Sequence, residues 1–130
     1  MSLKVAIFED DKDFADFMKD LMEKSHFEVL NCYTLKKDDW HDADVILGDY
    51  RNKIVPFTNL QIECESKGIP LIAISGNDTN YIPQLIKPFG MEDLQSTILK
   101  ELMKKNKIIT RPKTKSVNNF MNRMKGIFFD

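Results

Sequence analysis

The chain of 130 residues contains no apolar stretch long enough to span a bilayer, and its first residues lack the layout of a signal peptide. Its two cysteines, Cys32 and Cys64, do not have the spacing of a metal site. There is no internal repeat, and no glycine-rich loop of the G-x-x-x-x-G-K or G-x-G-x-x-G kind that cradles phosphates. These absences argue against a membrane, repeat or P-loop protein. They predict one cytoplasmic domain with reduced, partly buried thiols.

Charge is divided unevenly along the chain, although the net charge is only −1. Residues 1–103 carry 11 basic and 19 acidic side chains, a net charge of −8. Residues 104–130 carry 8 basic side chains and one acidic one, a net charge of +7. A basic tail on an acidic body is typical of an interaction arm, but it is equally consistent with attraction between tail and body.

Apolar runs alternate with amphipathic segments, which predicts an α/β protein. Strands are predicted over residues 3–8, 27–33, 44–48, 69–74 and 82–86. The first run is apolar without alternation, as in a strand that is buried on both faces, and Pro83 suits an edge position for the last. A helix is predicted after Asp13, which we expect to be an N-cap, and its apolar stripe consists of Phe14, Phe17, Met18, Leu21 and Met22. Further helices are predicted over residues 56–67 and 91–103. This order predicts a doubly wound, five-stranded parallel sheet with right-handed crossovers.

Four of the apolar runs end in polar residues of particular kinds. The first is followed by Glu9-Asp10-Asp11, the third by Asp49, the fourth by Ser75-Gly76 and the fifth by Lys87-Pro88-Phe89. Because the carboxyl ends of parallel strands meet at one edge of the sheet, we expect these side chains to share a crevice. Carboxylates, a hydroxyl and an ammonium together suit a cation and a phosphoryl group.

In these motifs the chain resembles the receiver domain of response regulators, the chemotaxis-regulator family of two-component signalling. The likeness covers about residues 3–103, and it rests on four motifs in order, which are Phe8-Glu9-Asp10-Asp11, the run 44–49, the run 69–76 and Lys87-Pro88-Phe89. The resemblance implies a flavodoxin-like fold with a receiver domain at residues 1–103. Residues 104–130 would then be a basic linker and a C-terminal amphipathic helix.

The resemblance also implies a role for individual residues. Asp49 matches the aspartate that accepts the phosphoryl group, and Ser75 matches the hydroxyl that contacts this group. Lys87 matches the lysine that pairs with Asp49 and then with the phosphoryl oxygens. The Mg²⁺ ligands implied are Glu9, Asp10, Asp49 and the backbone carbonyl of Arg51. Physical chemistry favours the same ion independently, because clustered carboxylates repel one another and a hard divalent cation relieves the repulsion.

The function implied is that of a phosphoprotein in a two-component phosphorelay. A sensor histidine kinase or a phosphotransfer protein would phosphorylate Asp49, and the product would bind a downstream protein. We expect no conventional enzyme, because self-phosphotransfer and autodephosphorylation consume Asp49 as substrate. The alternatives are a pseudo-receiver that binds protein without phosphorylation, and an unrelated α/β phosphohydrolase that depends on a nucleotide or on Mg²⁺. No base-reading motif supports binding of nucleic acid by the basic tail.

The spacing of the motifs departs from the family. Only eleven residues, 76–86, separate Ser75 from Lys87. A helix takes about 11–12 residues and a strand about 5–6, so the helix between strands four and five is predicted to be missing or reduced to a turn. The segment between strands two and three is also short, so we expect its helix to be stunted. Gln84 stands where the family often has an aromatic switch residue.

Loss of a helix is expected to bare part of the sheet and leave an apolar patch. The tail carries an apolar stripe at helical spacing, and its main members are Val117, Phe120, Met121 and Met124. We predict that this stripe, or a partner, covers the patch.

Overall fold

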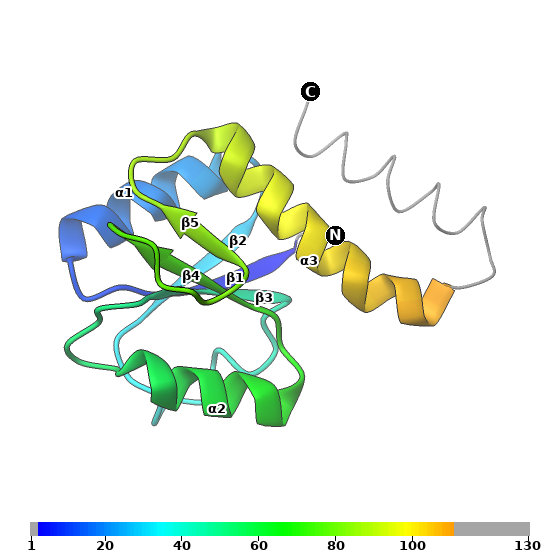
Figure 1. Cartoon of the computed structure of the whole chain (residues 1–130), viewed down its shortest axis with the longest axis horizontal. Helices are drawn as coiled ribbons and strands as arrows, with labels where there is room; N and C mark the ends of the chain where they lie inside the picture. The colour runs from blue at the N-terminus through cyan, green and yellow to red at the C-terminus, as the bar shows by residue number, and fades with distance from the viewer. Residues whose placement is uncertain (1–2, 111–130) are drawn as a thin grey trace.

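The computed structural model describes residues 3–110, with side chains for residues 3–104. Its strands are β1 (Lys4–Phe8), β2 (Glu28–Cys32), β3 (Val45–Asp49), β4 (Leu71–Ser75) and β5 (Gln84–Ile86). They form one parallel sheet in the order β2-β1-β3-β4-β5, which confirms the predicted fold class. Helices α1 (Lys12–Glu23) and α3 (Met91–Thr110) cover one face of the sheet, and α2 (Phe57–Lys67) covers the other (Figure 1).

Each face of the sheet has its own apolar core. Side chains alternate along each strand, so Ile7 and Leu47 face α1 and α3, whereas their neighbours Phe8 and Ile46 face α2. Met18 and Ile98 complete the first core, and Leu60 completes the second. Because both faces are covered, the central strands β1, β3 and β4 have apolar runs without alternation, whereas the edge strands β2 and β5 also carry Glu28, Asn31 and Gln84.

Helix α1 begins earlier than predicted. Its N-cap is Asp11, whose carboxylate accepts a hydrogen bond of 3.2 Å from the Phe14 N–H, whereas the sequence favoured Asp13. Asp13 lies in the first turn, where its negative charge is favourable to the helix dipole. Phe17, which the apolar stripe assigned to the core, is 60% exposed.

No helix connects β4 to β5 in the described chain, so the predicted loss is confirmed. Residues 76–83 form turns instead, and β5 begins at Gln84 rather than at 82. The segment between β2 and β3 also contains no helix. Trp40 lies in this segment and packs into the core, where only 1% of its surface is exposed. The Trp40 ring is in edge-to-face contact with the ring of Phe8. Ile82 is 81% exposed beside the missing helix.

Helix α3 is longer than predicted. It continues past Met103 to Thr110, so residues 104–110, which we assigned to a linker, are helical. Lys104, Lys105 and Lys107 are good helix formers, and no proline or glycine occurs before Pro112, so the helix can continue. Residues 111–130 lie outside the described part of the chain, so the predicted amphipathic helix there stays a prediction.

Two further expectations concern cysteine and membranes. Cys32 and Cys64 are unpaired and buried, and burial raises the pKa of each thiol to about 12. Within residues 3–110, no helix combines the length and the apolar character that crossing a membrane requires.

Candidate functional site

The register of the sheet brings the strand ends together. Phe8 pairs with Gly48, so Glu9 and Asp49 follow neighbouring positions of β1 and β3. On the other side, Asp49 pairs with Ile74, and Ser75 pairs with Ile86. The polar residues that follow four strands therefore lie along one edge, as their sequence positions predicted.

Three carboxylates meet at this edge. Glu9, Asp10 and Asp49 each contribute one carboxylate oxygen, and these three oxygens lie within 4.8 Å of one another. Glu9 is 2% exposed, and Asp10 is partly buried. Carboxylates at this separation repel one another strongly unless protons or a cation compensate their charge.

Backbone N–H groups orient each carboxylate. The N–H of Asp11 donates to Oε2 of Glu9 at 3.2 Å, and that of Arg51 donates to Oδ1 of Asp49 at 3.3 Å. The N–H of Lys53 donates to Oδ2 of Asp10 at 3.2 Å. These bonds hold the acids in place through the loops that follow β1 and β3.

Asn52 shapes the loop after β3. Its Oδ1 accepts hydrogen bonds of 2.8 Å from the N–H groups of Ile54 and Val55. The side chain is 9% exposed and stands where the backbone turns toward α2. This turn carries the Lys53 N–H to Asp10, so a residue with no predicted role supports the acidic cluster.

Lys87 reaches the cluster from the edge strand. Its Nζ lies 3.2 Å from Oε1 of Glu9, and among the described residues this is its one ion pair. The resemblance implied a pair with Asp49, but the ion pair in the structure is with Glu9. The ammonium also lies 4.0 Å from the centroid of the Phe14 ring.

Ser75 is held at the same edge. Its carbonyl accepts a hydrogen bond of 2.7 Å from the Lys87 N–H, and its hydroxyl oxygen accepts one of 3.2 Å from the Asn77 N–H. The hydroxyl is thus an acceptor for Asn77, and its own hydrogen is available to another acceptor.

The acids differ in proton affinity. Burial raises the pKa of Glu9 to about 7, helped by the charge of Asp49 and opposed by the Asp11 N–H. Burial likewise raises the pKa of Asp49 above its ordinary value. At Asp10 burial is outweighed by hydrogen bonds with the Lys53 N–H and the Asp49 carboxyl, which lower its pKa.

This donor set fits Mg²⁺. The ion prefers oxygen ligands, usually one or two carboxylates, and keeps several waters. Here the three clustered carboxylates supply such oxygens, and the raised pKa of buried Glu9 is the sign of a charge that lacks full compensation. Arg51 follows Asp49 by two residues in the turn after β3, and the role of its carbonyl stays a prediction.

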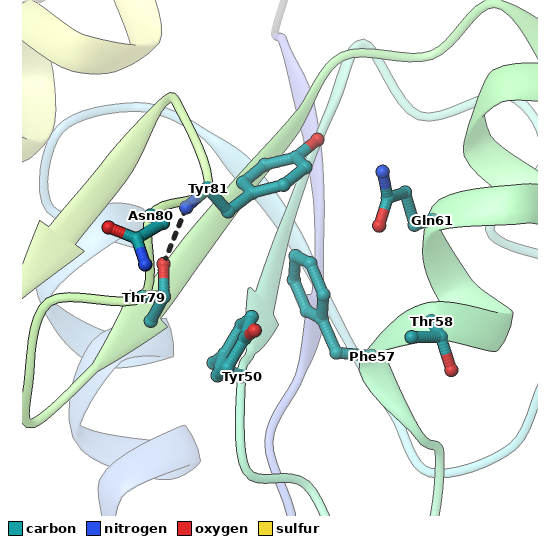
Figure 2. Close-up of a pocket in the computed structure, with 7 residues that line it drawn as sticks. All are labelled: Tyr50, Phe57, Thr58, Gln61, Thr79, Asn80 and Tyr81. Carbon is teal, nitrogen blue, oxygen red and sulfur yellow. Dashed lines mark hydrogen bonds between the residues drawn. The ribbon is translucent and has the colours of Figure 1, made fainter.

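An aromatic groove of about 410 Å³ lies beside the site (Figure 2). It opens between the start of α2 and the turns that replace the missing helix, and it is lined by Tyr50, Phe57, Thr58, Gln61, Thr79, Asn80 and Tyr81. The ring of Phe57 lies 5.0 Å from those of Tyr50 and Tyr81, between centroids. Tyr50 directly follows Asp49, so the groove and the acidic cluster share one loop.

Besides Asn52, sequence reasoning missed the roles of Phe14 and Asp11. Phe14 was assigned only to an apolar stripe, and Asp11 was given no role of its own. The sequence offered both Asp11 and Asp13 as N-caps, because aspartate is favourable at this position and both residues precede the apolar stripe. Phe14 and Lys87 are 73 positions apart in the sequence, and no local sequence pattern predicts their contact.

No protein-family model matches this chain, and no curated protein matches it. Solved structures do match. A CheY-like response-regulator receiver domain from Methanospirillum hungatei JF-1 is 19% identical, with a TM-score of 0.71 over 82% of this chain and 98% of that one. The receiver domain of Francisella response regulator 1452 is 22% identical, with a TM-score of 0.65 over 81% of this chain and 99% of that one.

A third similar structure, the Vibrio cholerae chemotaxis protein CheY4, is 17% identical, with a TM-score of 0.66 over 77% of this chain and 98% of that one. At these identities the likeness establishes the fold. The chain has the fold of response-regulator receiver domains, in a form without the helix between β4 and β5. This agrees with the resemblance found in the sequence motifs.

Proposed function

We propose that this chain is a phospho-accepting receiver of two-component signal transduction, acting in the cytoplasm. Asp49 would take a phosphoryl group from a sensor histidine kinase or a phosphotransfer protein, and the phosphorylated form would bind a downstream protein. The observation that carries the proposal is the meeting of Glu9, Asp10 and Asp49 within 4.8 Å, with the Lys87 ammonium 3.2 Å from Glu9.

Glu9, Asp10 and Asp49, with the backbone carbonyl of Arg51, would hold Mg²⁺. When bound, the ion would neutralise part of the negative charge on the phosphoryl oxygens. The donor set supports this assignment because the three carboxylates offer the hard oxygen ligands that the ion prefers.

Transfer would form a bond between an Asp49 carboxylate oxygen and phosphorus, and would break the phosphorus–nitrogen bond of the donor phosphohistidine. Lys87 would stabilise the charge on the phosphoryl oxygens, which is most of what this reaction needs. The free hydrogen of the Ser75 hydroxyl would donate to one of these oxygens. Asp49 is consumed as substrate, so the chain would not be a conventional enzyme.

Incubation of the full chain with phosphoramidate and Mg²⁺ tests the proposal. Intact-mass spectrometry should find one added phosphoryl group on the wild type and none on Asp49→Asn. The matched control is Asp78→Asn, an exposed aspartate beside the groove, which should react as the wild type does. A folded wild type that gains no phosphoryl group would overturn the proposal.

A phosphorylation-independent binding module is the second candidate. It is favoured by Gln84, which replaces the aromatic switch residue and is tied by hydrogen bonds into the turns before β5. The same experiment separates the two candidates, because only the first requires a reactive Asp49.

A further inference from the structure

Lys87 has a second partner besides Glu9. Its Nζ lies 4.0 Å from the centroid of the Phe14 ring, well inside the distance of about 6 Å at which a cation interacts with an aromatic face. The lysine side chain is 31% exposed, so solvent competes only in part. The ammonium is thus held by a carboxylate and by an aromatic ring at once.

The Phe14 ring is itself held in place. Its N–H donates to the carboxylate of Asp11, and the N–H of Ala15 donates to the Asp11 carbonyl at 2.9 Å. These bonds build the first turn of α1. The ring also packs against the core on this face of the sheet. The backbone of this turn is therefore fixed, and Phe14 can leave Lys87 only if its ring rotates out of its packing against the core.

Under the proposed function, Glu9 alone would bind the Lys87 ammonium less strongly than it does in the metal-free protein. Its oxygens would be shared with Mg²⁺, and a carboxylate bound to a cation attracts a second cation less. An aromatic face attracts an ammonium without a formal charge, and it has no oxygen that a hard metal ion would bind. The Phe14 ring would therefore continue to bind the Lys87 ammonium when the carboxylates coordinate Mg²⁺.

We propose that Phe14 is a positioning residue that holds the Lys87 ammonium at the acidic cluster, where it can meet the phosphoryl group on Asp49. The effect on phosphorylation rests on the proposed function, but the contact between Phe14 and Lys87 can be tested without phosphorylation. Asp11 contributes indirectly, because it caps α1 and so fixes the turn that contains Phe14.

The test compares Phe14→Leu with Phe14→Tyr in the full chain. Phe17→Leu is the matched control, since Phe17 is an exposed phenylalanine on the same helix whose ring centroid lies 6.4 Å from that of Phe14. The first measurement, without Mg²⁺, is the NMR chemical shift of the Lys87 methylene protons next to Nζ, assigned with Lys87→Arg. A ring at this distance shifts them upfield.

The upfield shift should be present in the wild type, in Phe14→Tyr and in Phe17→Leu, and lost in Phe14→Leu. The second measurement is the rate of phosphorylation by phosphoramidate with Mg²⁺. It should fall about two- to fivefold in Phe14→Leu, the range expected for a partly exposed cation–π contact, and recover in Phe14→Tyr.

Lys87 signals that are the same in the wild type and in Phe14→Leu would overturn the contact. A lost shift with an unchanged rate would overturn the positioning role. If the wild type takes up no phosphoryl group, the proposed function fails and the positioning role fails with it, while the chemical shift still decides whether Phe14 holds Lys87.

Discussion

The side-chain amide of Gln84 donates a hydrogen bond of 2.9 Å to Oδ1 of Asp78, across the turns that stand between β4 and β5. Its carbonyl oxygen accepts two more, from the N–H of Thr79 at 3.0 Å and from the Thr79 hydroxyl at 2.8 Å. The Thr79 hydroxyl oxygen in turn accepts from the Tyr81 N–H at 3.0 Å (Figure 2). One side chain thus fixes the segment that replaces a helix and that forms one wall of the aromatic groove.

Replacing Gln84 with alanine should therefore destabilise the protein. The N–H and hydroxyl of partly buried Thr79 would lose their acceptor, at a cost of about 1 kcal/mol or more in the free energy of unfolding. Urea denaturation measures the change. Asp78→Asn is the control, because asparagine keeps the oxygen that accepts from Gln84, and its effect should be much smaller. Equal effects of the two substitutions would contradict the role given to Gln84.

Glu9 should make the stability of the metal-free protein depend on pH. Its pKa is raised from 4.5 to about 7, so between these values the folded state binds more protons than the unfolded state. Stability from this group is fully present below about pH 4.5 and is lost as pH rises through about 7. Melting temperatures in EDTA between pH 5 and 8 should fall more steeply for the wild type than for Glu9→Gln. Parallel curves for the two proteins would exclude this linkage.

Gly48 is the β3 residue that precedes Asp49, and the structure leaves no room there for a side chain. A Cβ at this position would lie 2.7 Å from Cδ2 of Leu60 and 3.2 Å from Cδ1 of Leu71. Gly48→Ala should lower the free energy of unfolding by about 1–3 kcal/mol through overpacking. Gly76→Ala is the matched control, because a Cβ there meets nothing within 4 Å. A Gly48→Ala protein as stable as Gly76→Ala would show that α2 can move away freely.

The apolar stripe of the tail remains a prediction that removal of residues 111–130 can test. If the stripe covers the area bared by the missing helix, the shortened chain should melt at a lower temperature or change its oligomeric state. The double variant Phe120→Asp, Met124→Asp keeps the length of the tail and should behave like the deletion. Unchanged stability and unchanged oligomeric state in both proteins would argue against docking of the tail on its own domain.

Much of the site was predictable because it depends on strand ends. Apolar runs without alternation identify strands buried on both faces, and parallel strands end at one edge. This rule predicts that the residues at the strand ends gather at one edge, and these residues are Glu9, Asp10, Asp49, Ser75 and Lys87. The count of residues between Ser75 and Lys87 was likewise enough to predict the loss of a helix, because chain length limits what can be built.

Contacts between side chains from distant segments were not predictable in the same way. The sequence suggested that Lys87 pairs with Asp49, but in the structure its ammonium lies on Glu9 and on the ring of Phe14. Phe17 fits the apolar stripe of α1 as well as Phe14 does, yet it is 60% exposed. Helical spacing places both rings near one face, and only the packing of α1 on the sheet decides which ring is covered.

The sequence by itself determined the parallel sheet, the edge at which its polar residues gather and the absence of one helix, because these follow from local periodicity and chain length. Tertiary structure alone decided the partners of Lys87, the proton affinity of Glu9 and the shape of the groove beside Tyr50. Those properties depend on distances and burial among groups far apart in the chain, and such quantities exist only once the segments have packed together.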